Sequence, residues 1–413
     1  MQIKSLLIIG YTWPEPTTTA AGNRMLQLIR FFKERGFKIT FASTAGPSEY
    51  SLDLEVEGIQ SESIELNNSS FNDFVIGLNP DAILFDRYLT EEQFGWRVAE
   101  SVPNALRMLD TEDLHSLRLV REKCFKSGQK FTAELWLQDD LTKREIAAIY
   151  RSDLSLIIST YEMQLLTEVL HLDERFLVHL PFQLKELTAD EQNSWPPFTN
   201  RNNFICIGNG KHAPNIDAIK WLKKEIWPLI RKALPKAELH VYGAYLPEHI
   251  QQMHKPSAGF LVKGWAKNVQ EVMQNGRVNL APLRFGAGIK GKLVSAMQCG
   301  TPSVTTGIGA EGMHGELPWN GSIEDSAEAI ATAAIDLYLN EEKWYTAQTN
   351  GIDIINTFYD ERQLNDRLLN KIETIQNNPE NHRNQNFIGS LLLHQTMAST
   401  KYMSKWIEEK NKK

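Results

Sequence analysis

The strongest constraint on the fold is a rhythm of short apolar runs that alternate with helical segments. Ser5–Gly10 is an apolar run ended by glycine, which is typical of a buried parallel strand. Apolar residues at helical spacing follow it, and Gly36 ends that helix. Strands that alternate with helices predict an α/β fold with a doubly wound parallel sheet. The strands predicted in this first half are Ser5–Gly10, Lys38–Ser43, Ala82–Phe85, Ala105–Leu109, Ser155–Ile158 and Phe176–Leu180.

The rhythm stops and then starts again, which predicts two similar α/β domains. Residues 187–202 are polar and rich in turn-forming residues, so they are interpreted as a linker. After residue 323 the sequence indicates helices, and Asn386–Trp406 has the apolar spacing of a long amphipathic terminal helix. The strands predicted in the second half are Asn203–Gly208, Ala237–Gly243, Gly259–Gly264, Arg277–Pro282 and Ser303–Thr306.

Composition narrows the class of protein. A chain of 413 residues fits two domains of about 200 residues each. The net charge of −7 argues against nucleic acid as the main partner, because phosphate backbones are held by clustered cations. Cys124, Cys206 and Cys299 are widely separated, which favours a reducing compartment over a disulfide framework or a zinc site. No apolar run reaches the roughly 20 residues of a membrane span, and we expect no signal peptide and a cytoplasmic location.

Ligands of open parallel sheets lie beyond the carboxyl ends of the strands, so the loops there are the candidate site. The richest loop runs from Ala281 to Val294. Gly286 and Gly288 allow the backbone to approach a ligand closely, and a predicted helix start offers free N–H groups. Three cations in the same loop, Arg284, Lys290 and Lys292, complete a site for a diphosphate that needs no metal. The plainer alternative is a tight turn with solvated lysines.

Two further loops of the second half have matching chemistry. The segment Gly208–Asn215 carries glycines, Lys211 and His212 before a predicted helix. Lys263, Gly264 and Trp265 end a predicted strand, where the aromatic ring could face a flat base. The alternatives are a plain turn with a surface lysine and a partly buried tryptophan.

The first half contributes polar residues at equivalent places. Gly22 opens the first long helix, and Asp113 and His115 follow a predicted strand, which makes both residues catalytic candidates. In the alternative interpretation, Asp113 caps the next helix and His115 is structural. The basic stretch 118–130, with interleaved phenylalanines, could rest on an anionic membrane surface, but a solvated helix face is the preferred interpretation.

Several of these motifs resemble family 4 glycosyltransferases of the GT-B fold. The resemblance is specific from about Phe204 to Met313 and looser over the first half. It is carried by Ala281–Lys292, by Ala296–Thr306 with Gly309–Met313, and by His212–Ile219 with Ile226–Pro228.

The resemblance implies two Rossmann-like domains that face a central cleft, with a terminal helix that returns to the first domain. The implied boundaries are an acceptor-side domain at 1–186, the linker at 187–202, a nucleotide-sugar-binding domain at 203–380 and the terminal helix at 381–413. The implied activity is a retaining, metal-independent transfer from a nucleotide-diphosphate sugar to a glycan or lipid-linked acceptor, without a cofactor. Such enzymes usually build surface polysaccharides at the cytoplasmic face of a membrane, which makes peripheral membrane contact an expectation.

Individual site residues follow from the resemblance as well. Gly22 and His115 would line the donor sugar, and the base would lie near Lys263–Trp265. The residues implied to hold the rest of the donor are Gly208, Lys211, Asn215, Arg284, Gly286, Ala287, Gly288, Ile289, Lys290 and Lys292.

The sequence departs from the family pattern at two positions of the donor loop. Many relatives have two glutamates eight positions apart, one for the sugar hydroxyls and one for the ribose; here these positions are Ala287 and Ser295. A serine hydroxyl lacks the charge and two-point reach of a carboxylate. Glu311, after the next strand, is a candidate replacement for the ribose contact.

Other functions remain as alternatives. Ala287 and Ser295 motivate a catalytically impaired relative that binds a partner or a glycan. An epimerase of the same fold needs paired carboxylates, and the loops of the second half contain none. A dinucleotide-dependent dehydrogenase is disfavoured because neither first strand is followed by Gly-x-Gly-x-x-Gly.

Overall fold

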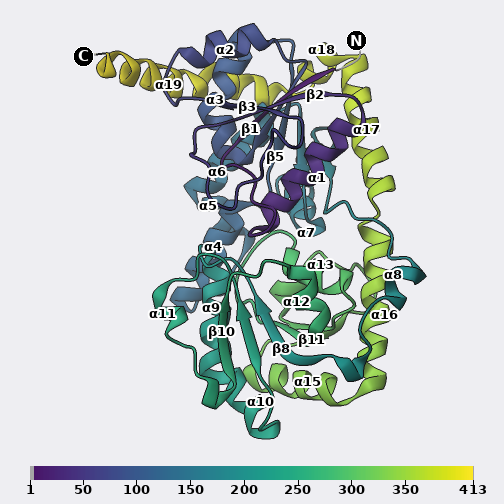
Figure 1. The fold of residues 1–413 in the computed structure, drawn as a ribbon. Helices are drawn as coiled ribbons and strands as arrows, with labels where there is room; N and C mark the ends of the chain where they lie inside the picture. The colour runs from purple at the N-terminus through teal and green to yellow at the C-terminus, as the bar shows by residue number, and fades with distance from the viewer. Residues whose placement is uncertain (1–3, 413) are drawn as a thin grey trace.

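The computed structural model describes residues 4–412, without the side chains of residues 395–397, and these residues form two parallel β-sheets (Figure 1). The first sheet has the order β3-β2-β1-β4-β5-β6-β7 and the second has the order β10-β9-β8-β11-β12-β13. The predicted fold of two doubly wound domains is therefore confirmed. The strands are β1 Ser5–Gly10, β2 Lys38–Ser43, β3 Gln60–Ser63, β4 Ala82–Asp86, β5 Leu106–Asp110, β6 Leu154–Ile157, β7 Leu177–His179, β8 Asn202–Ile207, β9 Leu239–Tyr242, β10 Phe260–Gly264, β11 Gly276–Ala281, β12 Ser303–Thr305 and β13 Gly321–Ile323.

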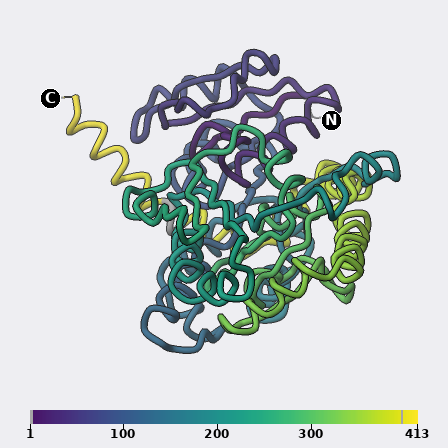
Figure 2. Tube along the Cα trace, turned by 60° about the horizontal axis from the view of Figure 1, so that its bottom comes forward, coloured from purple at the N-terminus to yellow at the C-terminus, as the bar shows by residue number. Residues whose placement is uncertain are grey.

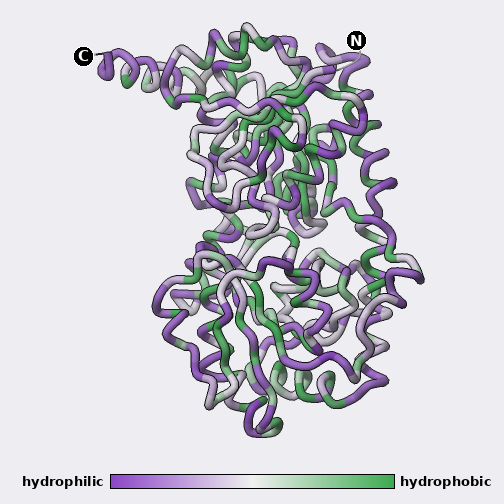
Figure 3. The backbone as a smooth tube through the Cα atoms, in the orientation of Figure 1, coloured by the Kyte–Doolittle hydropathy of each residue, from purple (hydrophilic) through white to green (hydrophobic). Residues whose placement is uncertain are grey.

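Helices cover both faces of each sheet, and apolar residues concentrate in the strands between them (Figure 3). The helices of the first domain are α1 Ala20–Glu34, α2 Ser70–Leu78, α3 Arg87–Ser101, α4 His115–Ser127, α5 Ala133–Gln138, α6 Asp140–Arg151 and α7 Thr160–Gln164. The remaining helices are α8 Ala189–Asn193, α9 Ala213–Trp221, α10 Trp227–Ala233, α11 Glu248–Gln251, α12 Val269–Asn275, α13 Gly291–Gln298, α14 Gly307–Ala310, α15 Ala327–Leu339, α16 Glu341–Phe358, α17 Glu361–Asn377, α18 Pro379–Asn384 and α19 Phe387–Asn411.

Strand β1 shows why a buried parallel strand is a continuous apolar run in the sequence. Leu6 and Ile8 belong to one buried cluster, and Leu7 and Ile9 belong to the cluster on the opposite face. Successive side chains of a strand point to opposite faces, so a strand covered by helices on both sides must be apolar at every position.

Two edge strands, β3 and β13, were missed by the sequence prediction. Their sequences are Gln-Ser-Glu-Ser and Gly-Ser-Ile, and none of their residues is fully buried. Short polar strands are common at sheet edges, where they protect the sheet from further pairing. Apolar periodicity cannot detect them because they contribute almost nothing to a core.

The C-terminal helices return to the first domain, as the fold class predicted. The returning segment was predicted to begin at residue 381. Helix α17, which lies before that residue, already contributes to the first-domain core through Leu364, Leu368, Ile372 and Ile375. Figure 1 shows α16 and α17 running along one side of both domains.

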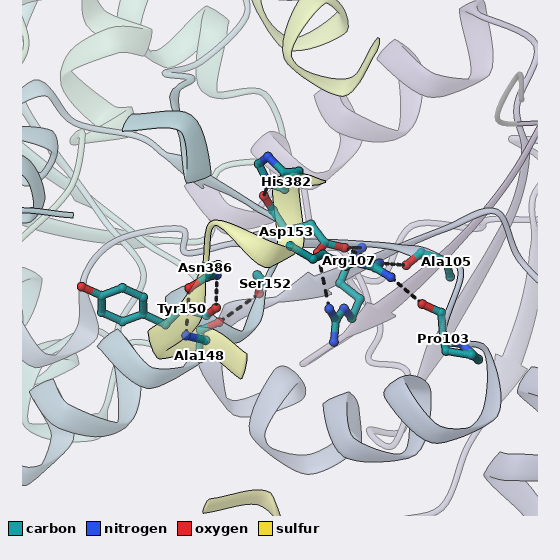
Figure 4. A network of polar contacts seen from close by, with 11 residues as sticks. Pro103, Ala105, Arg107, Ala148, Tyr150, Ser152, Asp153, His382 and Asn386 are labelled. Atoms are coloured by element: carbon teal, nitrogen blue, oxygen red, sulfur yellow. Dashed lines mark hydrogen bonds and ion pairs between the residues drawn. The ribbon is translucent and has the colours of Figure 1, made fainter. Parts of the chain in front are cut away.

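Polar contacts fix the end of this crossing (Figure 4). Arg383 donates from Nη2 to Asp153 at 2.7 Å and to the carbonyl of Ala105 at 2.7 Å. His382 lies 2.8 Å from the carbonyl oxygen of Asp153, and Asn386 donates to the carbonyl of Tyr150. Asp153 is itself buried and also accepts from Arg107, so Arg383 adds a second arginine to a carboxylate inside the first domain.

Helix α19 then projects from the body of the molecule (Figure 2). Its inner side is held by contacts such as Ser404 with Arg97 and Glu408 with Ser69. Its outer side exposes large apolar side chains, namely Phe387, Ile388, Leu391, Tyr402, Met403 and Trp406.

Candidate functional site

The loops at the carboxyl ends of both sheets meet at the interface between the domains. Two hydrogen bonds show this, each between a residue of the first domain and a residue of the second. Asn209 donates to the carbonyl of Thr18 at 3.4 Å, and Arg121 donates to the carbonyl of Gly286 at 2.9 Å. The predicted convergence of the two sets of loops is what parallel strands in facing sheets dictate.

The loop between β11 and α13 presses directly on the first domain. Gly288 has φ 63°, and a Cβ atom built there would lie 2.7 Å from the Cβ of Asp113. Only glycine combines this backbone conformation with this approach. Ala287 packs against the buried cluster of the first domain, and Ile289 is buried in a cluster that also contains Phe182. The tip of the loop is therefore part of the domain interface.

Two lysines of this loop lie where α13 begins, Lys290 buried and Lys292 half-buried. Lys290 donates to the carbonyl of Gly288 at 2.8 Å, and Lys292 donates to the side-chain oxygen of Asn215 at 2.6 Å. Burial lowers the pKa of Lys290 to about 8, although Glu311 favours its charged form. Burial also lowers the pKa of Lys292 to about 8. A lysine whose pKa is lowered by burial has too little negative charge around it to stabilise its charged form. An anion at the N-terminus of α13 would supply that charge.

The third predicted cation of the loop has a different environment. Arg284 forms a two-point ion pair with Asp217 of α9, at 2.8 and 2.6 Å. Its guanidinium also lies over the rings of Phe125 and Trp221. Arg284 is thus already neutralised and stacked, and its contacts hold the loop to α9 and α4.

The loop after β8 adds a third basic group near the same place. A Cβ atom at Gly208 would lie 2.8 Å from Lys292 Nζ, so that glycine makes room for the lysine. Lys211 is exposed, and its ammonium lies 3.6 Å from the centre of the Tyr245 ring. Burial lowers the pKa of His212 to about 3, and the nearby Arg118 acts in the same direction.

An aromatic cluster spans the two domains beside Lys211. The ring centres of Trp265 and Tyr50 are 5.0 Å apart, and those of Tyr50 and Tyr245 are 5.4 Å apart. Tyr245 also donates to both carboxylate oxygens of Glu15 at 3.1 Å. Trp265 is 40% exposed, so a flat ring can reach it from solvent.

The remaining donor-side residues lie around these groups. Lys263 is exposed at the end of β10, and Gly264 follows it with φ 76°. Ser295 is half-buried on α13. Gly22 lies in the first turn of α1, where a Cβ atom would meet the backbone of Glu15 at 2.4 Å.

The two catalytic candidates lie together on the first-domain side. Nε2 of His115 is 3.3 Å from Oδ1 of Asp113, whose other oxygen accepts from Arg118 at 2.9 Å. Burial lowers the pKa of His115 to about 4, although Asp113 favours its charged form. Burial opposes ionisation of Asp113, but Arg118 and His115 outweigh it and hold the pKa of Asp113 well below its usual range. At neutral pH the pair is a carboxylate beside an uncharged imidazole.

A buried carboxylate fixes the position of His115. Glu145 accepts the backbone N–H groups of His115 and Ser116 at 2.9 and 3.0 Å, and also accepts the Ser116 hydroxyl. These N–H groups open α4, so Glu145 takes the capping role that was considered for Asp113. Burial raises the pKa of Glu145 to about 7.

Glu311 has a partner in this structure that the sequence did not indicate. Both of its carboxylate oxygens accept from Arg121 of α4, at 2.7 and 2.8 Å. A pocket of 360 Å³ lies beside it, bordered by Thr160 of α7 and by the segment from Gly307 to Gly315. The predicted replacement for a ribose carboxylate is thus an interdomain ion pair in this arrangement.

Several residues at this interface were missed from the sequence, namely Glu15, Tyr50, Arg87, Glu112, Arg121 and Glu162. Two of them have an unusual backbone conformation with positive φ, which is 64° at Glu112 and 71° at Arg87. Arg87 directly follows the buried Asp86. Burial raises the pKa of Glu112 to about 8, and Asp110 adds to that effect. Strained backbone and buried charge next to His115 make this edge of the first sheet part of the candidate site.

The basic stretch on α4 does not form a free cationic surface. Lys123 pairs with Asp139, Lys126 pairs with Glu122, and Arg121 pairs with Glu311. Phe125 packs against Phe285 of the donor loop, with ring centres 5.5 Å apart. Arg121 and Phe125 therefore contact the second domain, whereas Lys123 and Lys126 form exposed pairs within the first.

Among residues 4–412, no group of three or more His, Cys, Asp or Glu side chains could hold a metal ion. Within the same part of the chain, no helix combines the length and apolarity needed to cross a bilayer.

Comparisons with known proteins agree with this architecture. Residues 201–340 match the family model described as glycosyl transferases group 1. A comparison with curated protein sequences gave no significant match.

Solved structures similar to this chain share little sequence with it. Sucrose-phosphate synthase from Thermosynechococcus elongatus has 13% identity and a TM-score of 0.66, over 90% of this chain and 99% of that one. HepE from Anabaena, solved with UDP and glucose, has 12% identity and a TM-score of 0.65, over 90% of this chain and 100% of that one. WaaG, a glycosyltransferase involved in lipopolysaccharide biosynthesis, has 10% identity and a TM-score of 0.61, over 88% of this chain and 98% of that one. The chain therefore has the fold of GT-B glycosyltransferases, with the group 1 sequence pattern in its second domain.

Proposed function

We propose that the protein is a glycosyltransferase that moves a sugar from a nucleotide-diphosphate donor to a glycan or lipid-linked acceptor. The observation that carries the proposal is a pair of lysines at the start of α13, the buried Lys290 and the half-buried Lys292, whose pKa values are both lowered. A diphosphate there would restore their charge and accept hydrogen bonds from the helix N-terminus. The group 1 pattern in residues 201–340 covers these residues.

The rest of the donor follows from this anchor. The base would lie at the cluster of Trp265, Tyr50 and Tyr245, beside Lys211 at the outer end of the interface. The sugar would then lie at the inner end, near Gly288 and His115. With lysines to neutralise the diphosphate, we propose that transfer needs no metal and no cofactor.

The first domain would supply the acceptor side of the reaction. Transfer breaks the bond between the anomeric carbon and the diphosphate oxygen and forms a bond to an acceptor hydroxyl oxygen. We propose retention of configuration, with the acceptor proton passing to the departing diphosphate. Neutral His115 would hydrogen-bond the sugar or the acceptor without adding charge, and Asp113 would orient its ring.

WaaG is described as acting in lipopolysaccharide biosynthesis, which supports a role in surface polysaccharide synthesis for this chain too. We propose a cytoplasmic protein with peripheral membrane contact through the exposed apolar side of α19, which includes Tyr402 and Trp406. Flotation with vesicles of anionic lipid tests this contact. Binding that is lost in a Tyr402→Ser, Trp406→Ser variant supports it, and equal flotation of both proteins contradicts it.

A direct test of the donor proposal is thermal unfolding with nucleoside diphosphates and nucleotide-sugars in the presence of EDTA. Binding at 100 times Kd adds about 2.7 kcal/mol of stability, which raises the melting temperature measurably. No shift with any nucleotide or nucleotide-sugar would exclude the proposed function.

A catalytically impaired binding protein is the second candidate, because Ala287 and Ser295 provide no carboxylate in the donor loop. Donor hydrolysis and transfer assays with glycan and lipid-linked acceptors separate the two functions. Slow release of free sugar from a bound nucleotide-sugar favours the enzyme. Tight donor binding without hydrolysis or transfer favours the binding protein.

A further inference from the structure

The side chain of Glu162 lies at the centre of the domain interface. It is fully buried on α7, and its Oε1 accepts two backbone N–H groups. One comes from Leu114 of the first domain at 3.0 Å, and the other comes from Gly288 of the donor loop at 2.9 Å. A single oxygen atom thus joins the residue before His115 to the tip of the donor loop.

The other oxygen of Glu162 has no such role. Oε2 is buried, and it has no hydrogen-bond partner among residues 4–412. A buried carboxyl oxygen without a partner destabilises the folded protein, so its presence calls for an explanation. Burial raises the pKa of Glu162 to about 8, and the negative charge of Asp113 adds to that effect. At neutral pH the group can therefore carry a proton on Oε2 and act as a donor as well as an acceptor.

We propose that Glu162 positions the donor sugar, with Oε2 forming a hydrogen bond to a sugar hydroxyl when a nucleotide-sugar is bound. The inference rests on the proposed function, because it takes the diphosphate to lie at Lys290 and Lys292. A sugar attached to that diphosphate must extend toward His115. Glu162 contacts both ends of this path, through Gly288 and Leu114.

The neighbouring side chains make this carboxyl group the natural recognition element. Ala287, next to Gly288, presents only a methyl group. Glu311 is paired with Arg121, and Glu145 is satisfied by three donors at the start of α4. A buried group that needs a partner can reject a ligand that lacks the matching hydroxyl, so Glu162 would also determine sugar specificity.

The test compares two affinities in each variant by calorimetry. The probes are UDP with UDP-glucose and GDP with GDP-mannose. The pair that binds the wild-type protein is then measured with each variant. Glu162→Leu keeps the volume but removes both oxygens, whereas Glu162→Gln keeps an oxygen for the two N–H groups and a polar atom for the sugar. Glu91→Gln is the control, because Glu91 is an equally buried carboxylate paired with Arg151 within the first domain.

We expect Glu162→Leu to weaken the nucleotide-sugar by about tenfold while changing nucleoside diphosphate binding by less than about threefold. Glu162→Gln and Glu91→Gln should keep the wild-type ratio of the two affinities. Equal losses for both ligands in Glu162→Leu, or an unchanged ratio, would show that Glu162 only joins the loops. Absence of any nucleotide binding to the wild-type protein would instead reject the proposed function.

A second measurement does not depend on the folding of a variant. In a crystal structure of the wild-type protein with the nucleotide-sugar that binds it, Oε2 of Glu162 should lie within about 3.2 Å of a sugar hydroxyl oxygen. Bound nucleotide-sugar with Oε2 still unpaired, or paired only with water, would overturn the assignment.

Discussion

At the scale of single residues, the account depends on charges that the protein keeps out of water. Within the described part of the chain, the buried Lys290 and the half-buried Lys292 have no carboxylate bonded to them, whereas Arg284 in the same loop is paired with Asp217 at two points. The loop therefore separates two tasks that look alike in sequence. One arginine holds the loop in place, and two lysines are available to an anion.

Replacing Lys290 by methionine tests this division of roles. The variant Lys290→Met keeps most of the buried side chain and removes the charge, so nucleoside diphosphate affinity should fall by about tenfold or more. Calorimetry at pH 7 measures the change. Lys220→Met, at an exposed position of α9, is the matched control and should bind like the wild-type protein. Wild-type affinity in the Lys290 variant would contradict the assigned role.

The lysine pKa values predict how binding depends on pH. Both lysines have a pKa of about 8 in the free protein, and a bound diphosphate raises these values because it favours the charged forms. Below pH 8 both lysines are already charged, so the affinity for the diphosphate is at its maximum. Above pH 8 the protein must take up protons to bind, and affinity falls by up to about tenfold per pH unit for each lysine. Titrations from pH 7 to 9 should show this decline; a constant Kd would show that the lysines do not face the ligand.

At the scale of elements, α4 links the catalytic candidates to the donor loop. His115 is its first residue, and Arg121, two turns later, contacts both Glu311 and the carbonyl of Gly286. The sequence favoured a solvated helix face, which describes Lys123 and Lys126, whereas Arg121 is used at the domain interface. Motion of the second domain relative to the first must break these contacts.

Removing the arginine should favour an open arrangement of the domains. In Arg121→Met, Glu311 and the Gly286 carbonyl lose their partner, so we expect a larger radius of gyration by small-angle X-ray scattering. Donor affinity should fall by about tenfold, because the open state lacks the first-domain contacts. Lys126→Met on the same helix removes only an exposed pair with Glu122 and should leave both quantities unchanged. An unchanged radius and affinity in Arg121→Met would contradict this role of α4.

The sequence predicted those features that depend on neighbouring residues in the chain. Buried strands such as β1 reveal themselves by continuous apolar runs, and the Gly286–Lys292 loop by its glycines and lysines. Partners distant in sequence left no signal. Glu162 meets Gly288 across 126 positions, and Arg121 meets Glu311 across 190. Each side chain alone resembles an ordinary helical residue, so only the packing of the two domains reveals its role.

At the scale of the whole molecule, the C-terminal segment connects the second domain to the first a second time. Helix α17 completes the core of the first domain, and Arg383 of α18 joins Asp153 to the carbonyl groups of Pro103 and Ala105. Two segments of the chain thus connect the domains, the linker and this C-terminal segment. Domain motion must bend both connections together.

Loss of the Arg383 contacts should therefore destabilise the first domain. Arg383→Ala removes the donor to the carbonyl groups of Pro103 and Ala105 and one of the two arginines that pair with the buried Asp153, which costs about 2 kcal/mol. Urea unfolding measures the change. Lys143→Ala, which removes an exposed pair with Asp140 within α6, should change stability by less than about 1 kcal/mol. Equal stabilities of the two variants would contradict the anchoring role.

The central claim is that the second domain holds a nucleotide-sugar by its diphosphate at the start of α13. A crystal structure of the protein with the nucleoside diphosphate that stabilises it, grown without divalent metal, tests this most directly. The account predicts the phosphates within hydrogen-bond distance of Lys290 and Lys292, with the base beside Trp265. Phosphates bound elsewhere, or lysines that remain without contact to them, would contradict it.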